Sequence, residues 1–173
     1  MLKKLSLEKC KIHDDGAVAI SESLKVNKSL EDLNLNNCGI GARGGKAIGE
    51  ALQLGTAVLT VTDLRFNNLD TESATLLATI AKEKGVSLCG IKPDQTEANL
   101  QGKPGLRMGP LDAILLTADL AVRAVLTNLN LADNNLCGNK FGGKYDASGI
   151  QALSDALASG RAEIPPLTSR RTT

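Results

Sequence analysis

The stretch that decides the fold covers residues 30–40 and reads Leu-Glu-Asp-Leu-Asn-Leu-Asn-Asn-Cys-Gly-Ile. Its apolar side chains fall at Leu30, Leu33, Leu35, Cys38 and Ile40. The alternation through Leu33 and Leu35 has a period of two, which predicts a short strand with one buried face. Cys38 follows at the point where this strand ends, and we expect its side chain to turn inward there.

The same spacing recurs along the chain, with first leucines at positions 2, 30, 59, 88 and 126. The first, second and fifth copies match at every position, and the third departs only at Thr62. The fourth keeps Ile91 and then degenerates at Pro93. A period of 28–29 residues between the first four copies indicates a stack of repeated units.

The second half of each unit changes its apolar period from two to about 3.6, which predicts a helix after each strand. Residues 16, 20 and 24 of the first unit recur at 44, 48 and 52 of the second. One strand and one helix cannot bury their own apolar stripe, so neighbouring units must stack. We therefore expect parallel strands on one face and helices on the other. The Cys or Asn at the strand end turns inward, and an Asn there can satisfy backbone groups of the turn.

The period, the alternating Cys or Asn and the G-x-x-x-I-x-x-x-L helices resemble leucine-rich repeats of the ribonuclease-inhibitor type. The resemblance covers about residues 1–160 and is weakest from 92 to 109. It implies an α/β leucine-rich-repeat solenoid, a horseshoe of about five repeats with parallel strands on the concave face. Ran GTPase-activating proteins, tropomodulin-like actin regulators and intracellular immune receptors have similar arrays, so the resemblance implies a fold and not a particular ligand.

The repeat register gives one solenoid over residues 1–164 and a disordered tail over 165–173. Insertions are expected near 93–109 and 137–147, where the spacing exceeds the period. In the fourth unit we predict a strand at 89–91, an irregular excursion over 93–109 and a helix from Pro110 to about Arg123. The strand that begins at Leu126 should then stack directly on that of Leu88.

Composition excludes several classes of protein. A formal net charge of +1 gives no electrostatic case for nucleic acid or for an anionic membrane. No apolar run approaches the roughly 20 residues that span a bilayer, and the first residues do not form a signal-peptide core. The four cysteines lie far apart and are interpreted as reduced thiols of a cytoplasmic protein.

Candidates for catalysis are few. The chain has one histidine, His13, in a polar loop, and no Cys-x-x-Cys pair that would anchor a zinc ion. Gly39, Gly41 and Gly44 match the G-x-G-x-x-G pattern of dinucleotide sites, but Gly44 occupies the same repeat position as Gly16. We therefore expect no catalytic residue, no cofactor and no metal, and a protein that is not an enzyme.

Side chains that alternate with the buried leucines should face solvent on the concave side. The predicted partner-binding residues of this face are Lys4, Glu8, Asp32, Asn34, Asn36, Asp63, Arg65, Lys92, Asn128, Asn130 and Asp133. Phe141 and Tyr145 in the second insertion are predicted as aromatic anchors. The alternative is that these polar side chains are only solvated.

The leading hypothesis is a protein–protein interaction scaffold that uses the concave face and the insertion loop to bind a protein of unknown identity. Two alternatives remain open. The resemblance to one branch of the family suggests a regulatory GTPase-activating-type fragment. The unit that opens at Leu2 without a polar cap suggests a structural piece that self-associates through its ends.

Overall fold

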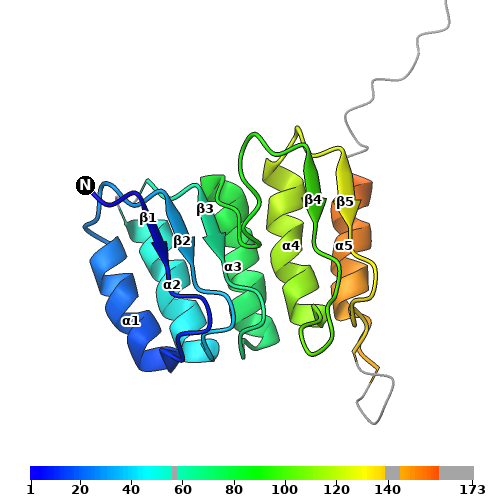
Figure 1. Ribbon diagram of the computed structural model, residues 1–173, viewed down its shortest axis with the longest axis horizontal. Helices are drawn as coiled ribbons and strands as arrows, with labels where there is room; N and C mark the ends of the chain where they lie inside the picture. Colours follow the sequence, from blue (N-terminus) through cyan, green and yellow to red (C-terminus); the bar gives the residue numbers. More distant parts are fainter. Residues whose placement is uncertain (56–57, 139–144, 160–173) are drawn as a thin grey trace, which may run out of the picture.

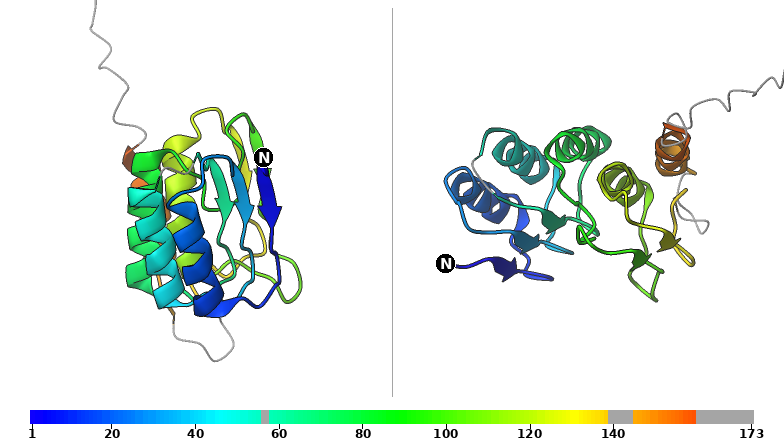
Figure 2. Two further views of the ribbon diagram at one scale, coloured as in Figure 1. Left: turned by 90° about the vertical axis from the view of Figure 1, so that its left-hand side faces the viewer. Right: turned by 90° about the horizontal axis from the view of Figure 1, so that it is seen from above.

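The computed structural model describes residues 1–55, 58–138 and 145–159, in which five strands alternate with five helices (Figure 1). In chain order these elements are β1 (Lys4–Ser6), α1 (His13–Leu24), β2 (Asp32–Asn34), α2 (Ala42–Leu54), β3 (Val61–Asp63), α3 (Thr71–Lys84), β4 (Glu97–Asn99), α4 (Pro110–Val122), β5 (Asn128–Asn130) and α5 (Ser148–Ser159). The strands form one layer and the helices the other, as the repeat predicts (Figure 2).

Between the layers lies a core of leucine, isoleucine and alanine side chains. Leu33, Leu35, Ile40 and Leu64 are among its least exposed members, and all four are repeat positions. Burying a side chain of this size contributes about 1.5–3 kcal/mol. The stack therefore derives most of its stability from equivalent layers of small apolar contacts.

The first three strands pair in parallel, in the order β1-β2-β3. Leu5 pairs with Leu33 and Leu33 with Thr62, so the repeat register is confirmed for these units. Thr62 is 1% exposed, and its hydroxyl donates to the carbonyl of Leu33 at 2.9 Å. This hydrogen bond explains why a polar residue is accepted in the row of leucines.

Asn67 holds the second and third units together where their strands end. Its Oδ1 accepts hydrogen bonds from the backbone N–H groups of Cys38 and Ile40, both at 3.0 Å. Its Nδ2 donates to the carbonyls of Leu35 at 2.9 Å and Leu64 at 2.8 Å. One side chain thus satisfies four backbone groups in two successive units, as the sequence predicts for this position.

The same position is used in other units. Asn134 donates to the carbonyls of Leu100 and Leu131 at 2.8 and 3.0 Å. The thiol of Cys38 donates to the carbonyl of Leu7 at 3.0 Å. The structural interpretation of Cys38 is therefore confirmed, whereas its equivalent in the first unit, Cys10, is exposed.

The sheet breaks between the third and fourth units. β4 pairs with β5 in a separate two-stranded sheet, with Ala98 opposite Leu129. The predicted strand at 89–91 is therefore wrong, as is the prediction that 93–109 is wholly irregular. The strand that begins at Leu126 does not stack on that of Leu88 either. The helix predicted from Pro110 is confirmed as α4.

Residues 86–91 fill part of the space at the edge of β3. Ser87 forms an isolated parallel bridge with Val61, and Cys89 forms an antiparallel one with Asp63. The N–H groups of Thr62 and Leu64 donate to carbonyls of this segment. The strand of the fourth unit is β4, which pairs in parallel with β5. Ala98 takes the place of the leucine that the repeat predicts there.

Two buried charged residues, one in α4 and one just after its last residue, hold the segment 86–91 in place. The carboxylate of Asp119 accepts hydrogen bonds from the Ser87 hydroxyl and from the N–H groups of Leu88 at 3.0 Å and Cys89 at 3.1 Å. Burial raises the pKa of Asp119 above its usual range, although these hydrogen bonds oppose the shift. Asp119 therefore supplies the acceptors that a neighbouring strand would otherwise provide.

Arg123, one helical turn further along, supplies the donors. Its guanidinium donates to the carbonyls of Ile91 at 3.1 Å and Thr60 at 2.7 Å. Burial lowers the pKa of Arg123, and the nearby Asp119 opposes that shift. The two side chains together satisfy the backbone at the break.

The second insertion is described only at its ends, where the N–H of Asp146 donates to the carbonyl of Cys137 at 3.0 Å. Phe141 and the predicted disordered tail over 165–173 lie outside the described residues. Among the residues that are described, no helix has the length and apolar character needed to cross a bilayer.

The role of Asn67 can be tested by the substitution Asn67→Ala. It leaves backbone groups of two units without partners and should lower the free energy of unfolding by about 2–4 kcal/mol. Urea unfolding followed by circular dichroism measures the change. Asn68→Ala is the matched control, because Asn68 is exposed, and it should change stability by less than about 0.5 kcal/mol. Equal effects of the two substitutions would contradict the role of Asn67.

The substitution Asp119→Ala tests the junction. It removes the acceptors of the Leu88 and Cys89 amides, so hydrogen exchange at these amides should accelerate at least about tenfold. Asp155→Ala removes an exposed carboxylate of α5 and should leave both amides unchanged. Unaltered exchange in the Asp119 variant would show that the segment does not depend on this carboxylate.

Candidate functional site

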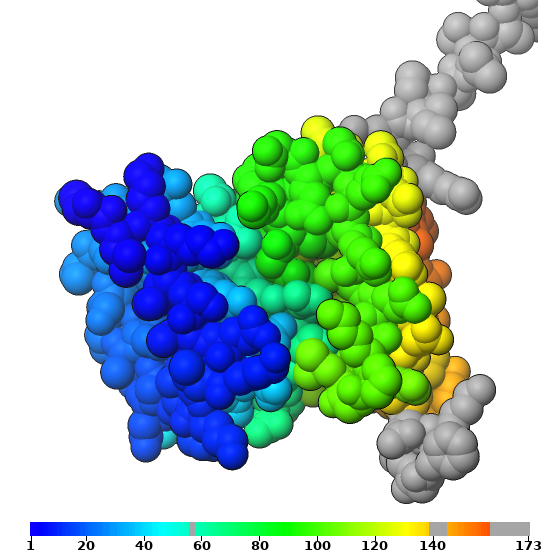
Figure 3. Space-filling view, viewed as in Figure 1, coloured from blue at the N-terminus to red at the C-terminus, as the bar shows by residue number. Residues whose placement is uncertain are grey.

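The strand face is hollowed where the sheet breaks (Figure 3). This hollow has a volume of about 290 Å³. Its first wall and floor come from the first three units: Glu8, Asn34, Asn36, Asp63, Arg65 and Phe66. Its second wall comes from β4 and the turn that follows: Asn99, Leu100, Gln101, Lys103 and Leu106. Side chains far apart in the sequence therefore meet on one surface.

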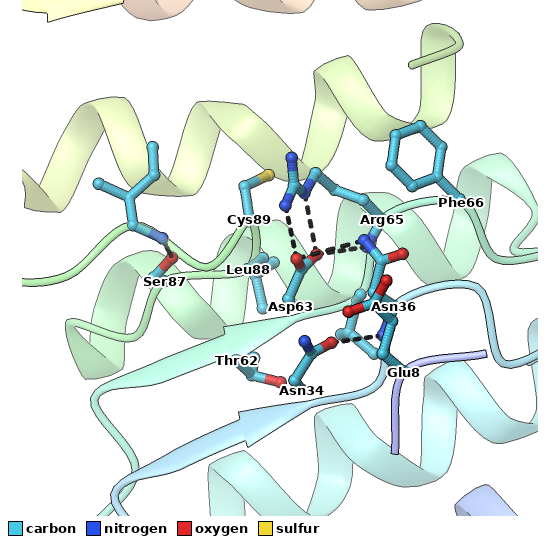
Figure 4. A network of polar contacts seen from close by, with 12 residues as sticks. Glu8, Asn34, Asn36, Thr62, Asp63, Arg65, Phe66, Ser87, Leu88 and Cys89 are labelled. Carbon is cyan, nitrogen blue, oxygen red and sulfur yellow. Dashed lines mark hydrogen bonds and ion pairs between the residues drawn. The ribbon is translucent and has the colours of Figure 1, made fainter. Parts of the chain in front are cut away.

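An ion pair lies at the floor of the hollow (Figure 4). The Nε of Arg65 donates to Asp63 Oδ1 at 2.9 Å, and its Nη2 donates to Oδ2 at 2.6 Å. The amide of Asn36 also donates to Oδ2, at 3.2 Å. Burial alone would lower the pKa of Arg65, but the hydrogen bond and attraction of Asp63 raise it above its ordinary value. Arg65 is therefore a fixed cation.

Phe66 forms the side of the hollow next to this pair. The guanidinium carbon of Arg65 lies 5.7 Å from the centroid of the Phe66 ring, within the range of a cation–π interaction. Phe66 has a φ of 61°, and its N–H donates to Asp112 Oδ1 at 2.8 Å. Burial raises the pKa of Asp112, which also accepts from the Gly109 N–H at 2.9 Å. A carboxylate of α4 thus fixes the aromatic wall.

The polar residue at the end of each strand from β2 to β5 caps its own turn. In each case a side-chain oxygen accepts a hydrogen bond from the backbone N–H two residues further on, an arrangement that Asn and Asp favour. The pairs are Asn34 with Asn36, Asp63 with Arg65, Asn99 with Gln101, and Asn130 with Ala132. Part of the polar floor predicted for a partner therefore has a structural use.

The structure brings together five of the residues predicted for the concave face: Glu8, Asn34, Asn36, Asp63 and Arg65. The prediction that all of them face solvent is wrong for Asn36 and Asp63, which are buried because they bond to each other and to Arg65. Lys4 and Asp32 instead form an ion pair of 2.9 Å at the start of β1 and β2, outside the hollow. Asn128 and Asn130 lie on β5, beyond β4. Asp133 follows them and accepts a hydrogen bond from Gln101 Nε2 at 2.8 Å.

Lys92 does not lie on a strand, so its predicted place on the strand face is wrong. It lies between the segment 86–91 and β4, and its N–H donates to Gln95 Oε1 at 3.2 Å. The error follows from the register of the fourth unit. In the observed register β4 contributes Glu97 and Asn99 instead.

Tyr145 is 73% exposed and precedes α5, away from the residues that line the hollow. A hydrogen bond with Cys137 raises its pKa. The prediction that Phe141 and Tyr145 act together as an anchor therefore stays a prediction, because only Tyr145 is described.

Asn99, Gln101 and Lys103 were not predicted as site residues. A signal for them exists, since residues 97–101 alternate polar and apolar around Ala98 and Leu100. Accepting alanine at a leucine position would have identified this strand.

The glycine pattern at 39–44 has a structural explanation. Asp14 Oδ1 accepts hydrogen bonds from the N–H groups of Gly41 at 2.7 Å and Gly44 at 2.8 Å, at the start of α2. A helix N-terminus is the place where a phosphate would bind. Here a carboxylate of the preceding unit occupies it, which argues against a dinucleotide. Within the described part of the chain, no group of three or more His, Cys, Asp or Glu could hold a metal ion.

The family model described as "Leucine Rich repeat" matches residues 1–21 and 26–49. These ranges cover most of the first two strand–helix units. No curated protein sequence matches the chain. The match, the parallel strands and the alternating helices together support a leucine-rich repeat protein, a class whose repeats commonly mediate protein–protein interaction.

The substitution Arg65→Ala tests whether the ion pair with Asp63 stabilises the fold. It leaves the Asp63 carboxylate, which is 7% exposed, without its cation and should lower the free energy of unfolding by about 2–4 kcal/mol. Lys103→Ala, at the rim of the same hollow, should cost less than about 0.5 kcal/mol. Urea unfolding of both variants measures the difference, and a stable Arg65 variant would contradict the structural role.

Proposed function

We propose that this protein is a non-enzymatic interaction scaffold that binds a protein partner on its strand face, centred on the hollow. The observation that carries the proposal is the convergence of polar side chains from two separate sheets on one depression. Surfaces of this kind hold a partner by hydrogen bonds and charge pairs, which favour specificity and a fast on-rate.

The proposal includes the ribonuclease-inhibitor-like subtype and a cytoplasmic location. The equivalent roles of Cys38 and Asn67 at the strand ends support the subtype. The four cysteines, all free thiols, support a reducing compartment. Tyr145, exposed at the second insertion, is a further contact for the same partner in this proposal.

Self-association is a second candidate, because large apolar side chains are exposed on the two outer units. Met1 is 98%, Leu2 62% and Leu157 63% exposed. A second copy that stacks on either unit would bury them, and stacking between unlike ends would make open assemblies. This candidate uses the outer units and not the hollow, so the two are separable.

The test is a charge swap across the hollow, Glu8→Lys with Lys103→Glu, which leaves the net charge unchanged. Both side chains are exposed, so the fold should persist. The matched control is the swap Lys82→Glu with Glu83→Lys on α3, which is also exposed. Affinity capture from cells with quantitative mass spectrometry should yield a partner that the wild type and the control retain. The hollow variant should lose it at least tenfold.

Equal capture of the partner by the wild type, the hollow variant and the α3 control would refute binding at the hollow. Loss in the α3 control alone would place the site on the helix face. Light scattering of the wild type across a range of concentrations should show a monomer, whereas a mass that grows with concentration would favour self-association.

A further inference from the structure

We infer that the hollow accepts an extended segment of the partner, which lies along the open edge of β4 and directs an acidic side chain to Arg65 and Lys103. This inference rests on the proposed function and specifies the chemistry of the partner. It follows from the backbone of β4, the shape of the hollow and the balance of its charges.

β4 has an open edge toward the hollow. The N–H groups of Leu100 and Gly102 donate to carbonyls of the chain around β5, both at 2.9 Å. Backbone groups of successive strand residues point to opposite edges, so those of Asn99 and Gln101 point away from β5. The Gln101 N–H already donates to Asn99 Oδ1 at 3.1 Å. Within the described residues no hydrogen bond engages the N–H or C=O of Asn99 or the C=O of Gln101, so these groups are open to an incoming chain.

The facing edge of β3 is closed by contrast. The N–H of Thr62 donates to the Ser87 carbonyl, and that of Leu64 donates to the Leu88 carbonyl, both at 2.9 Å. Of the residues that the structure describes, only β5 pairs with β4, on the side away from the hollow. An added strand therefore has one place to pair at the break, along β4.

The size of the hollow favours an extended segment over a helix. A volume of about 290 Å³ holds one or two side chains, whereas a helix with its side chains is about 10–12 Å across. An extended chain pairs its backbone with a strand edge and places alternate side chains on one face, which is the mode of strand addition. One such side chain would then enter the hollow.

The charges of the hollow favour an acidic side chain. Both carboxylates that line the hollow already have cationic partners. Glu8 Oε1 lies 3.0 Å from Lys9 Nζ, and Asp63 forms an ion pair with Arg65. Arg65 uses Nε and Nη2 for Asp63, and Figure 4 shows its other terminal nitrogen pointing away from that carboxylate. Lys103 forms no ion pair with any described residue. The uncommitted groups are cationic donors, which bind carboxylates most strongly.

A second depression, on the helix face between α3 and α5, is the competing location. Its volume is about 600 Å³, and alanine, threonine and serine side chains line much of it. It presents no strand edge, so it would suit a helix and not an extended chain. The two locations therefore predict different peptides.

The test uses phage-displayed random twelve-residue peptides selected on the full chain. Selected peptides should share an acidic residue, and a synthetic consensus peptide should bind at least tenfold more weakly when that residue is changed from Glu to Gln. Lys103→Gln should remove most of this difference, whereas Lys82→Gln on the helix face should preserve it. Two further peptides each carry one N-methylated backbone amide, on one side or the other of the acidic residue. At least one of them should bind at least tenfold more weakly than the consensus peptide.

A selection that enriches no peptide, or peptides without an acidic residue, overturns the inference. So does binding that N-methylation does not affect, or that depends on Lys82 and not on Lys103. The proposed function fails separately, if the charge swap across the hollow leaves partner capture unchanged. Partner capture that depends on the hollow, together with peptides that lack the acidic residue, would retain the function and reject this segment chemistry.

Discussion

The structure depends on how backbone groups are satisfied where each strand ends and the chain turns toward its helix. Asn67 links two units through four backbone hydrogen bonds, and Asn134 links the fourth and fifth units through three. Buried backbone groups without partners cost about 1–3 kcal/mol each. A side chain at this position, Asn67 or Asn134, thus ties the ends of two neighbouring strands together.

The break in the sheet coincides with a change of residue type at this position in the fourth unit. Because Asn99 pairs with Asn130, Lys103 is the equivalent of Asn134. A lysine ammonium donates hydrogen bonds but accepts none. It cannot receive the backbone N–H groups that Asn67 receives, and the third unit is not joined to the fourth by strand pairing. Carboxylates from α4 take over: Asp112 accepts from Phe66, and Asp119 accepts from residues 87–89.

Much of the fold could be predicted from the sequence, because the regular units obey one pattern. The unit that begins at Leu88 misled the register for a physical reason. Leu88 and Ile91 are 0% and 1% exposed, so their spacing correctly signals burial. Burial does not determine which segment pairs with β5. The residue that pairs with Leu129 is Ala98, and its small side chain does not match the leucine expected at that position of the repeat.

The candidate site likewise contains residues that the repeat predicts and residues that it does not. Asn34, Asp63 and Arg65 could be predicted because they lie on regular units, where strand alternation gives the exposed face. Lys103 could not, because its place follows from the shifted register of the fourth unit. The hollow itself arises from the break between the sheets, and no repeat pattern encodes a break.

The hollow cannot close by simple pairing of β3 with β4. Such pairing would displace residues 86–91 from β3 and remove the donors that hold the Asp119 carboxylate in its buried position. An unpaired buried carboxylate costs far more than the few strand hydrogen bonds that would form in exchange. Arg123 reinforces this preference, since its guanidinium is held by carbonyls on both sides of the break. The open edge of β4 is thus maintained by a buried polar network on the opposite layer, which leaves the strand face free to take its missing strand from another molecule.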